Sequence, residues 1–185
     1  MPWQVLGVEL LRTKVVSETH KLVVEHLARI RGMAGFEDST AVLCLESNLG
    51  YECQHITLAL ARAEVPRWVV LNEGAGGTIG FLTTNQTKEQ MMMMTRDALR
   101  VGCIALADGF FSTTMSENDA LEKLRDELGR FSVVVEPPHT LFGKPRRTFT
   151  GKQGAQQDDL AIAFQLCMIA IRTFHMSSKY QRYRD

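Results

Sequence analysis

A short apolar run, TAVLCL at residues 40–45, limits the folds that are open to this sequence. It has no alternation of polar and apolar residues, which is typical of a strand buried on both faces of a helix-covered sheet. Helix-like segments at 17–31 and 51–63 flank it, and further strands are predicted at 3–11 and 67–71. This alternation predicts an α/β fold, with right-handed crossovers wherever the strands are parallel.

Beyond residue 80 the same reasoning predicts more elements of one domain. Two helices and two short strands are expected, at 84–101, 118–129, 103–107 and 131–135. Ser116 with Asp119 resembles a helix-capping pair. The last helix, 159–173, is apolar on nearly all sides and is therefore expected to be buried. We predict a single domain over 1–185, with a core of 1–175 and a polar basic tail at 176–185.

The charge of the chain is balanced overall but not along its length. The 21 Lys and Arg match the 21 Asp and Glu, so the net charge is zero. Residues 139–185 nevertheless hold eight Lys or Arg against three Asp, which gives +5 there and leaves −5 on residues 1–138. Positive charge gathered at one end favours a surface that faces a polyanion. A solvated surface with a basic tail is the alternative.

Neither a membrane span nor a secretory signal is predicted. No run reaches the about 18 apolar residues of a membrane helix, and MPWQVLGVELL lacks the basic start and cleavage site of a signal peptide. The four cysteines are scattered, with a spacing that fits neither a zinc site nor a disulfide framework: Cys44, Cys53, Cys103 and Cys167. We therefore expect reduced core cysteines in an intracellular protein.

Glu46 is the first candidate functional residue, because it directly follows the apolar strand at 40–45. An acid in this place lies at the carboxyl edge of an α/β sheet, where such folds form their active sites. Asn48 and Glu52 are close in sequence. The alternative is that Glu46 is simply a polar residue that opens a loop.

Asp158 and Asp159 form the second candidate, a pair of acids directly before the apolar helix. Their mutual repulsion must be offset. A helix N-terminus would do so if Asp158 were a plain N-cap, which explains one acid better than two. A divalent cation would do so for both, because clustered carboxylate oxygens are its natural ligands.

Basic residues just upstream favour the cation. Lys152, Arg146 and Arg147, with Lys144, belong to a segment short enough to share a face with the two acids. Acids for metal beside bases for phosphate is the combination that phosphodiester hydrolysis requires. Lys and Arg would hold a nucleic-acid backbone by charge, without reading its sequence.

Several blocks of the sequence resemble one known family. TAVLCLESNLGYECQHI looks like the strand-acid-helix motif of the herpesvirus terminase large subunit nuclease, and TGKQGAQQDDLAIAFQLCMIAI resembles its closing motif. Between them, GFLTTNQTKEQMMMMTRDALRVGCIAL has the look of the turn and helix of that family, and VLGVELLRT resembles its third strand. The blocks follow in the right order and span nearly the whole chain. Tailed-phage terminases share this architecture.

The resemblance implies a ribonuclease H-like mixed sheet flanked by helices, with two Mg²⁺ or Mn²⁺ ions. In the family, a strand-1 Asp and acids at the positions of Glu46, Asp158 and Asp159 bind the metals. Lys152 falls on the Gly-Lys position, near the metals or the scissile phosphate. The implied enzyme cuts concatemeric double-stranded DNA, works with other terminase subunits and the capsid portal, and acts inside the host nucleus if the chain is herpesvirus-like.

The family's first two strands, with their leading Asp-Pro motif, have no counterpart before Met1. We therefore expect an N-terminally truncated fold, a fragment that also lacks the GxxxxGK[ST] motif of the packaging motor. Glu9 is the only early acid within an expected strand and so the first candidate to replace the missing Asp, although it aligns better with an acid of the family's third strand. Loss of one ligand would weaken the binding of at least one metal ion.

Three functions follow from these observations. The first is a two-metal endonuclease in which Glu46, Asp158 and Asp159 hold metal, Lys152 steadies the phosphate, and Lys144, Arg146 and Arg147 bind DNA. The second is a non-catalytic DNA-binding or assembly module descended from such a nuclease, whose DNA binding would depend on salt but not on metal. The third is an unrelated α/β hydrolase or nucleotidyl-transfer enzyme.

Overall fold

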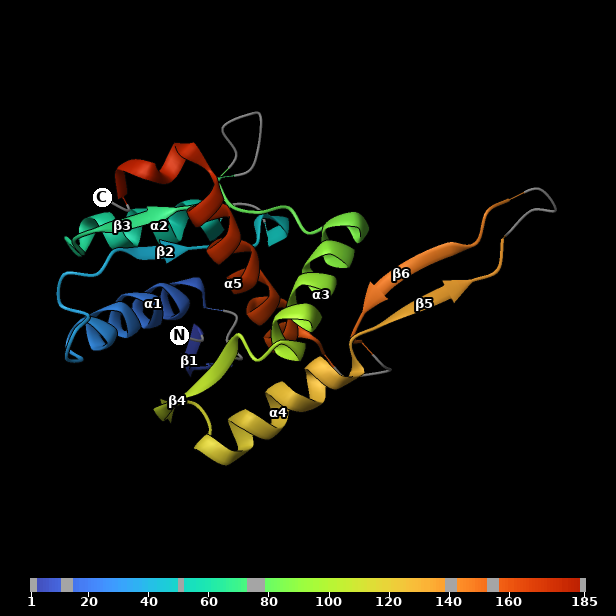
Figure 1. The fold of residues 1–185 in the computed structure, drawn as a ribbon. Coiled ribbons are helices and arrows are strands. Elements are labelled where there is room, and N and C mark those ends of the chain that lie inside the picture. Colours follow the sequence, from blue (N-terminus) through green and yellow to red (C-terminus); the bar gives the residue numbers. More distant parts are fainter. Residues whose placement is uncertain are drawn as a thin grey trace. The chain divides into compact units, whose positions relative to one another are not determined.

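Helices and short strands alternate along the chain in the computed structural model, which describes residues 3–10, 15–49, 52–72, 79–138, 143–152 and 157–183 (Figure 1). The strands are β1 (Trp3–Gly7), β2 (Ala41–Leu43), β3 (Trp68–Val70), β4 (Ile104–Phe111), β5 (Ser132–Glu136) and β6 (Arg146–Thr150). The α-helices are α1 (Val16–Arg31), α2 (Glu52–Arg62), α3 (Asn85–Arg100), α4 (Glu117–Arg130) and α5 (Asp159–Met176). Two 3-10 helices are η1 (Ser47–Leu49) and η2 (Ser178–Tyr183). The fold is α/β.

The chain forms two compact units. Unit 1 combines Met1–Leu10 with Thr84–Met168, and unit 2 combines Leu11–Thr83 with Ile169–Asp185. The last residues of α5 therefore belong to unit 2. The single domain expected over residues 1–185 stays a prediction. The segment expected to be a polar tail contains η2, whose Tyr180 is buried.

Unit 2 contains the parallel pair of β2 and β3 that the alternation of strands and helices predicts. Its register places Ala41 opposite Trp68, Val42 opposite Val69 and Leu43 opposite Val70. Two isolated parallel bridges lie beyond the strand ends, Glu46 with Phe81 and Asn72 with Gly80. The segment at 80–81 therefore runs alongside the carboxyl ends of both strands.

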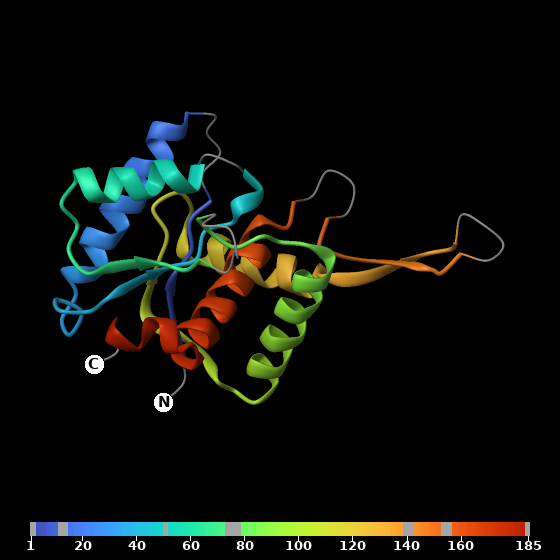
Figure 2. The same ribbon diagram turned by 90° about the horizontal axis from the view of Figure 1, so that it is seen from above.

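Helices cover both sides of this strand pair. Val69 and Leu71 pack with Ala170 of α5 and Tyr180 of η2 in one buried cluster. Helices α1 and α2 contact each other, and Figure 2 shows them on the side of the strands opposite η2. Residues 41–45 are half-buried between these layers, which agrees with the lack of polar and apolar alternation in this run.

Unit 1 contains a second parallel pair, β1 with β4, in which Trp3 lies opposite Ile104. A register irregularity then brings Gly7 opposite Phe111. A Cβ atom on Gly7 would clash with the carbonyl oxygen of Phe111. The backbones approach so closely that only glycine fits at this position.

Strands β5 and β6 of unit 1 form an antiparallel ribbon. Its register runs from Ser132 opposite Thr150 to Glu136 opposite Arg146. Phe149 is buried, and β6 contacts α3, which secures the base of the ribbon. Farther out, Val134 and Val135 are exposed, and Figure 1 shows the ribbon extending away from α3 and α4.

The predicted helices agree with α1 to α5 to within three residues at every end. The side chain of Ser116 accepts the N–H of Asp119, which confirms the capping pair. Strand β6 was not predicted, because its sequence RRTFT looks like a solvated loop. We expected one mixed sheet, whereas the described strands form three two-stranded sheets.

Helix α5 is less buried than its composition suggests, since Ala163 and Cys167 are exposed. Within the described residues it is the one helix long and apolar enough to cross a membrane, with a mean hydropathy of 1.3, a property that core helices of soluble proteins share. All four cysteines are free. Cys53 is buried and Cys44 is half-buried, whereas Cys103 and Cys167 are exposed, so the expectation of core cysteines is wrong for the last two.

Candidate functional site

Asp158 lies between β6 and α5, and it is only 2% exposed. Its Oδ2 atom accepts the N–H of Gly151 at 2.9 Å and the hydroxyl of Thr150 at 3.2 Å. Its Oδ1 atom lies 4.0 Å from Nζ of Lys152. A buried carboxylate is tolerated where hydrogen bonds and an opposite charge replace water. The structure thus brings together Asp158 and Lys152, two of the residues selected from the sequence.

Gly151 allows this arrangement because it has no side chain. A Cβ atom there would lie 2.9 Å from Cβ of Asp158 and 3.2 Å from Cδ2 of Phe131. The backbone of Gly151 also accepts a long hydrogen bond from Arg130 of α4, at 3.5 Å. The end of α4, the end of β6 and the start of α5 therefore meet around one glycine.

The backbone of Asp158 occupies the N-cap position of α5, as the N-cap alternative predicts. The carbonyl of Asp158 accepts the N–H of Ile162 at 2.9 Å, which is the first helical bond of α5. Its carboxylate, however, bonds to Gly151 and Thr150, on the β6 side. Asp159 is exposed as the first residue of α5. Both acids therefore sit at the positive end of a helix, with different surroundings.

Glu127 of α4 is a buried acid that the sequence analysis missed. Its Oε2 atom accepts the N–H of Leu160 at 2.8 Å and that of Ala161 at 3.2 Å, and its Oε1 atom lies 3.2 Å from Nζ of Lys123. In the sequence it is one of several charges of an amphipathic helix. Its spacing from Ala120 and Leu124, both buried, is the signal that places it on the apolar face.

Glu46 belongs to unit 2, where it follows β2 as predicted and is half-buried. Its Oε1 atom accepts hydrogen bonds from the hydroxyl of Thr83 and, at 3.1 Å, from Nδ2 of Asn48. Nδ2 of Asn48 also donates to the carbonyl of Thr83 at 3.0 Å. Asn48 was noted in the sequence, but Thr83 was not, because it lies 37 residues from Glu46. Glu52 begins α2, and its side chain lies outside the described part.

Gly80 shapes the loop that carries Thr83. Its φ angle is +102°, a conformation that side chains disfavour. A Cβ atom there would lie 2.8 Å from the carbonyl oxygen of Leu45 and 3.1 Å from Sγ of Cys53. A glycine is therefore needed for the chain to pass this close to the end of β2 and reach Glu46.

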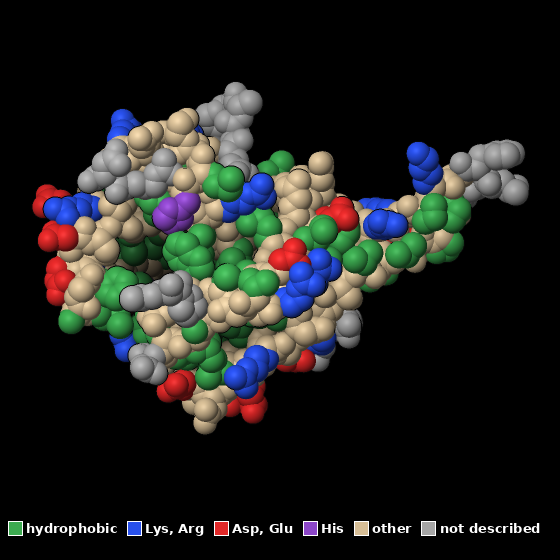
Figure 3. Space-filling view, in the orientation of Figure 1, with side chains coloured by type: hydrophobic (Ala, Val, Ile, Leu, Met, Phe, Trp, Pro, Cys, Tyr) green, Lys and Arg blue, Asp and Glu red, His purple; other side chains and the backbone are tan. Residues whose placement is uncertain are grey.

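The predicted DNA-binding residues lie on or beside the ribbon of β5 and β6. Arg146 and Arg147 are exposed on β6, and Lys144 is exposed just before it. Successive strand residues point to opposite faces, so the two arginines serve different faces of the ribbon. The carbonyl of Arg147 accepts Nδ2 of Asn85 at 3.0 Å, which ties the ribbon to the start of α3. Figure 3 shows basic and apolar side chains together along it.

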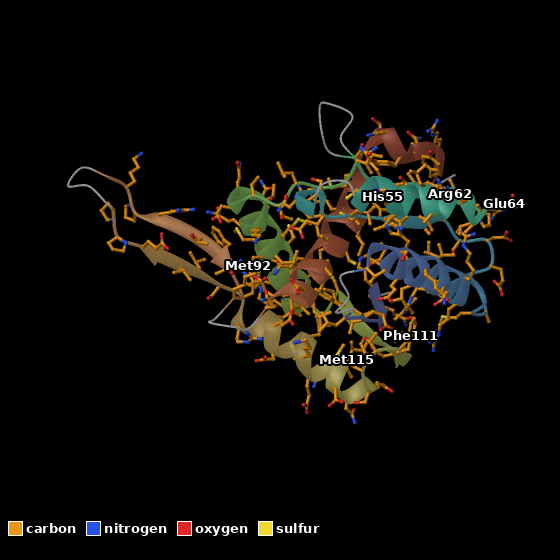
Figure 4. All side chains as sticks on the ribbon, turned by 180° about the vertical axis from the view of Figure 1, so that it is seen from behind. His55, Arg62, Glu64, Met92, Phe111 and Met115 are labelled. Carbon is orange, nitrogen blue, oxygen red and sulfur yellow. The ribbon has the colours of Figure 1, made fainter. Side chains whose placement is uncertain are left out.

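Glu9, considered as a substitute for the missing Asp, holds the turn after β4. Figure 4 labels Phe111 and Met115 on either side of this turn. The carboxylate of Glu9 accepts the hydroxyl of Thr114 at 2.8 Å and its N–H at 3.1 Å, and it also accepts the N–H of Thr113. These hydrogen bonds hold the turn in place, and a metal ion could bind to Glu9 only by replacing some of them.

The donor atoms fit a hard divalent cation in type, because Glu46, Asp158 and Asp159 all offer carboxylate oxygens. Glu46 belongs to unit 2, whereas Asp158 and Asp159 belong to unit 1. Across the described residues, no group of three or more His, Cys, Asp and Glu is placed to hold a metal ion.

No family model, no curated protein and no solved structure matches this chain.

Proposed function

We propose that this chain is the nuclease domain of a viral DNA-packaging terminase, a metal-dependent endonuclease that cuts concatemeric double-stranded DNA. The observation that carries the proposal is the buried Asp158 beside Lys152 at the start of an apolar helix. An acid for a divalent cation next to a base for a phosphate is what phosphodiester hydrolysis requires. A ribonuclease H-like arrangement of the strands is part of the proposal.

In the proposed site Glu46, Asp158 and Asp159 hold two Mg²⁺ or Mn²⁺ ions. Two such ions, when bound, activate a water molecule and stabilise the leaving oxygen. Thr83 and Asn48 orient Glu46, and Gly151 orients Asp158. Lys152 is 57% exposed, so its side chain is free to turn from Asp158 to the scissile phosphate once a cation neutralises the carboxylate.

Duplex DNA is held in this proposal by Lys152 and by the ribbon residues Lys144, Arg146 and Arg147. Their charges contact phosphates and so bind without sequence preference. Other terminase subunits and the capsid portal are the proposed protein partners, by resemblance to the terminase family. The same resemblance places the proposed activity inside the cell, in the host nucleus for a herpesvirus-like source.

A non-catalytic DNA-binding or assembly module is the second candidate. The engagement of Glu9 by the turn at 112–114 favours it, because these hydrogen bonds already occupy the carboxylate that could replace the missing Asp. Such a module would bind DNA through the ribbon and would not need metal. Its binding would weaken with salt and persist in EDTA.

The test is cleavage of supercoiled plasmid by the purified chain in Mn²⁺, beside the variant Glu46→Ala. The endonuclease proposal expects cleavage by the wild-type chain and none by the variant. Glu122→Ala is the matched control, because it removes an exposed acid of α4 that bonds to none of the site residues in the described contacts. Folded protein that binds DNA equally well with Mn²⁺ and with EDTA, and does not cut it, would establish the second candidate.

A further inference from the structure

Glu127 is a buried charge that the proposed chemistry does not use. Its side chain has no exposed area, whereas Lys123, which faces it, is 29% exposed. Its Oε2 atom accepts two backbone N–H groups, those of Leu160 and Ala161. A buried carboxylate requires such partners, because it has lost its water. Its location, across from the first turn of α5, suggests a task connected with that turn.

These two N–H groups are the ones that an N-cap side chain ordinarily takes. An N-cap oxygen accepts the amide two or three residues ahead. Asp158 occupies the N-cap position of α5, so Leu160 and Ala161 are its natural partners. Because Glu127 already accepts both, the carboxylate of Asp158 is available to Gly151 and lies near Lys152.

We infer that Glu127 is a positioning residue: it occupies the capping amides of α5 and thereby keeps the Asp158 carboxylate turned toward Gly151 and Lys152. The inference rests on the proposed function in one respect, namely that Asp158 binds a metal ion. Without an acceptor at 127, the Asp158 carboxylate would rotate onto the amides of Leu160 and Ala161. That rotation would break its bond to Gly151.

The hydrogen bond to Gly151 provides a direct readout that needs no metal. NMR of the full chain would follow the Gly151 amide in Glu127→Leu, which removes the acceptor. We expect faster solvent exchange and a changed chemical shift at Gly151. The double variant Lys123→Met/Glu127→Gln keeps an acceptor oxygen without the charge pair, and it should restore the wild-type signal. Glu122→Gln, on an exposed position of the same helix, should change nothing.

Mn²⁺ titration calorimetry on the same proteins separates a positioning role from a merely structural one. Loss of a residue that orients a metal ligand weakens metal binding by about 10- to 100-fold, so Glu127→Leu should show this loss and the double variant should recover it. A purely structural role would lower the melting temperature of Glu127→Leu and leave its Mn²⁺ affinity unchanged. If Glu127→Leu proves too unstable to study, Glu127→Met also removes the acceptor and keeps more of the side-chain length, and the same changes at Gly151 and in Mn²⁺ affinity are expected.

The two readouts also distinguish the inference from the function on which it rests. A wild-type chain that binds no Mn²⁺, with a Gly151 amide that still responds to Glu127→Leu, would remove the proposed function and keep the positioning of Asp158. If the Gly151 amide stays unchanged in folded Glu127→Leu, the inference is overturned, whether or not the wild-type chain cleaves DNA.

Discussion

The two acids at the centre of the proposal are held by different kinds of groups. Glu46 in unit 2 is oriented by side chains, the hydroxyl of Thr83 and the amide of Asn48. Asp158 in unit 1 accepts a backbone N–H in addition to the hydroxyl of Thr150, and it is buried. A side-chain bond is lost by one substitution at the partner, whereas a backbone bond is lost only when the chain itself moves. The geometry of Asp158 should therefore be the more robust of the two, and its loss the more costly.

The largest expected effect is on stability when each acid is removed. Asp158→Ala leaves the buried N–H of Gly151 without its acceptor, and we expect the free energy of unfolding to fall by about 3 kcal/mol. Glu46→Ala at a half-buried site should cost about 1 kcal/mol. Urea unfolding of both variants measures the difference. Equal losses would mean that burial and backbone anchoring do not distinguish the two acids.

Gly151→Ala tests how closely unit 1 is packed around Asp158. The added methyl group would press on Cβ of Asp158, and we expect a loss of about 2 kcal/mol in the free energy of unfolding. Gly129→Ala is the matched control, because nothing lies within 4 Å of its Cβ position and it belongs to α4. There alanine should stabilise by about 0.5–1 kcal/mol. The melting temperatures of the two variants provide the measurement. A similar change in melting temperature for both would show that the surroundings of Gly151 are not closely packed.

Thr83→Val tests the side-chain anchoring of Glu46. The substitution keeps the shape of the residue and removes the hydroxyl donor, so we expect a loss of about 1 kcal/mol in the free energy of unfolding. Thr83→Ser keeps the hydroxyl and should preserve the Mn²⁺ affinity of the chain. Calorimetric titration of both variants with Mn²⁺ provides the measurement. Weaker binding by Thr83→Ser than by Thr83→Val would show that the methyl group of Thr83 matters more than its hydroxyl.

The smallest effect on stability is expected at the ribbon. Arg146→Ala and Arg147→Ala change exposed side chains and should alter the free energy of unfolding by less than about 0.5 kcal/mol. In a plot of the logarithm of the DNA-binding constant against the logarithm of the salt concentration, each substitution should make the slope about one unit less steep. Fluorescence anisotropy with a labelled duplex at several salt concentrations measures this slope. Arg125→Ala, an exposed charge on α4, should leave it unchanged.

Local patterns in the sequence were sufficient for most of the elements. The spacing of apolar residues predicted each α-helix, and Ser116 predicted the start of α4. The apolar run before Glu46 predicted a strand, which the structure has as β2 (Ala41–Leu43), although this strand is half-buried and ends before Glu46. These features depend on neighbours within one or two turns of chain, so a single sequence contains the information.

Features that depend on distant partners were not predicted. Thr83 bonds to an acid 37 residues away, and Glu127 caps a helix that begins more than 30 residues later. Strand β6 is recognisable only through its partner β5, because four of its five residues are polar. Such pairings follow from how the chain folds back on itself, which one sequence without relatives does not reveal.

The bond between Glu9 and the turn after β4 has a consequence for how this chain is made. The two partners are 104 residues apart, and β1 likewise pairs with a strand about as distant. A ribosome adds about 5–20 residues per second, so β1 leaves it roughly ten seconds before β4 exists. During that interval the apolar stretch WQVLG has no partner strand from unit 1. The parallel pair of β1 and β4, together with the bonds that hold Glu9, can therefore form only after about 60% of the chain has been made.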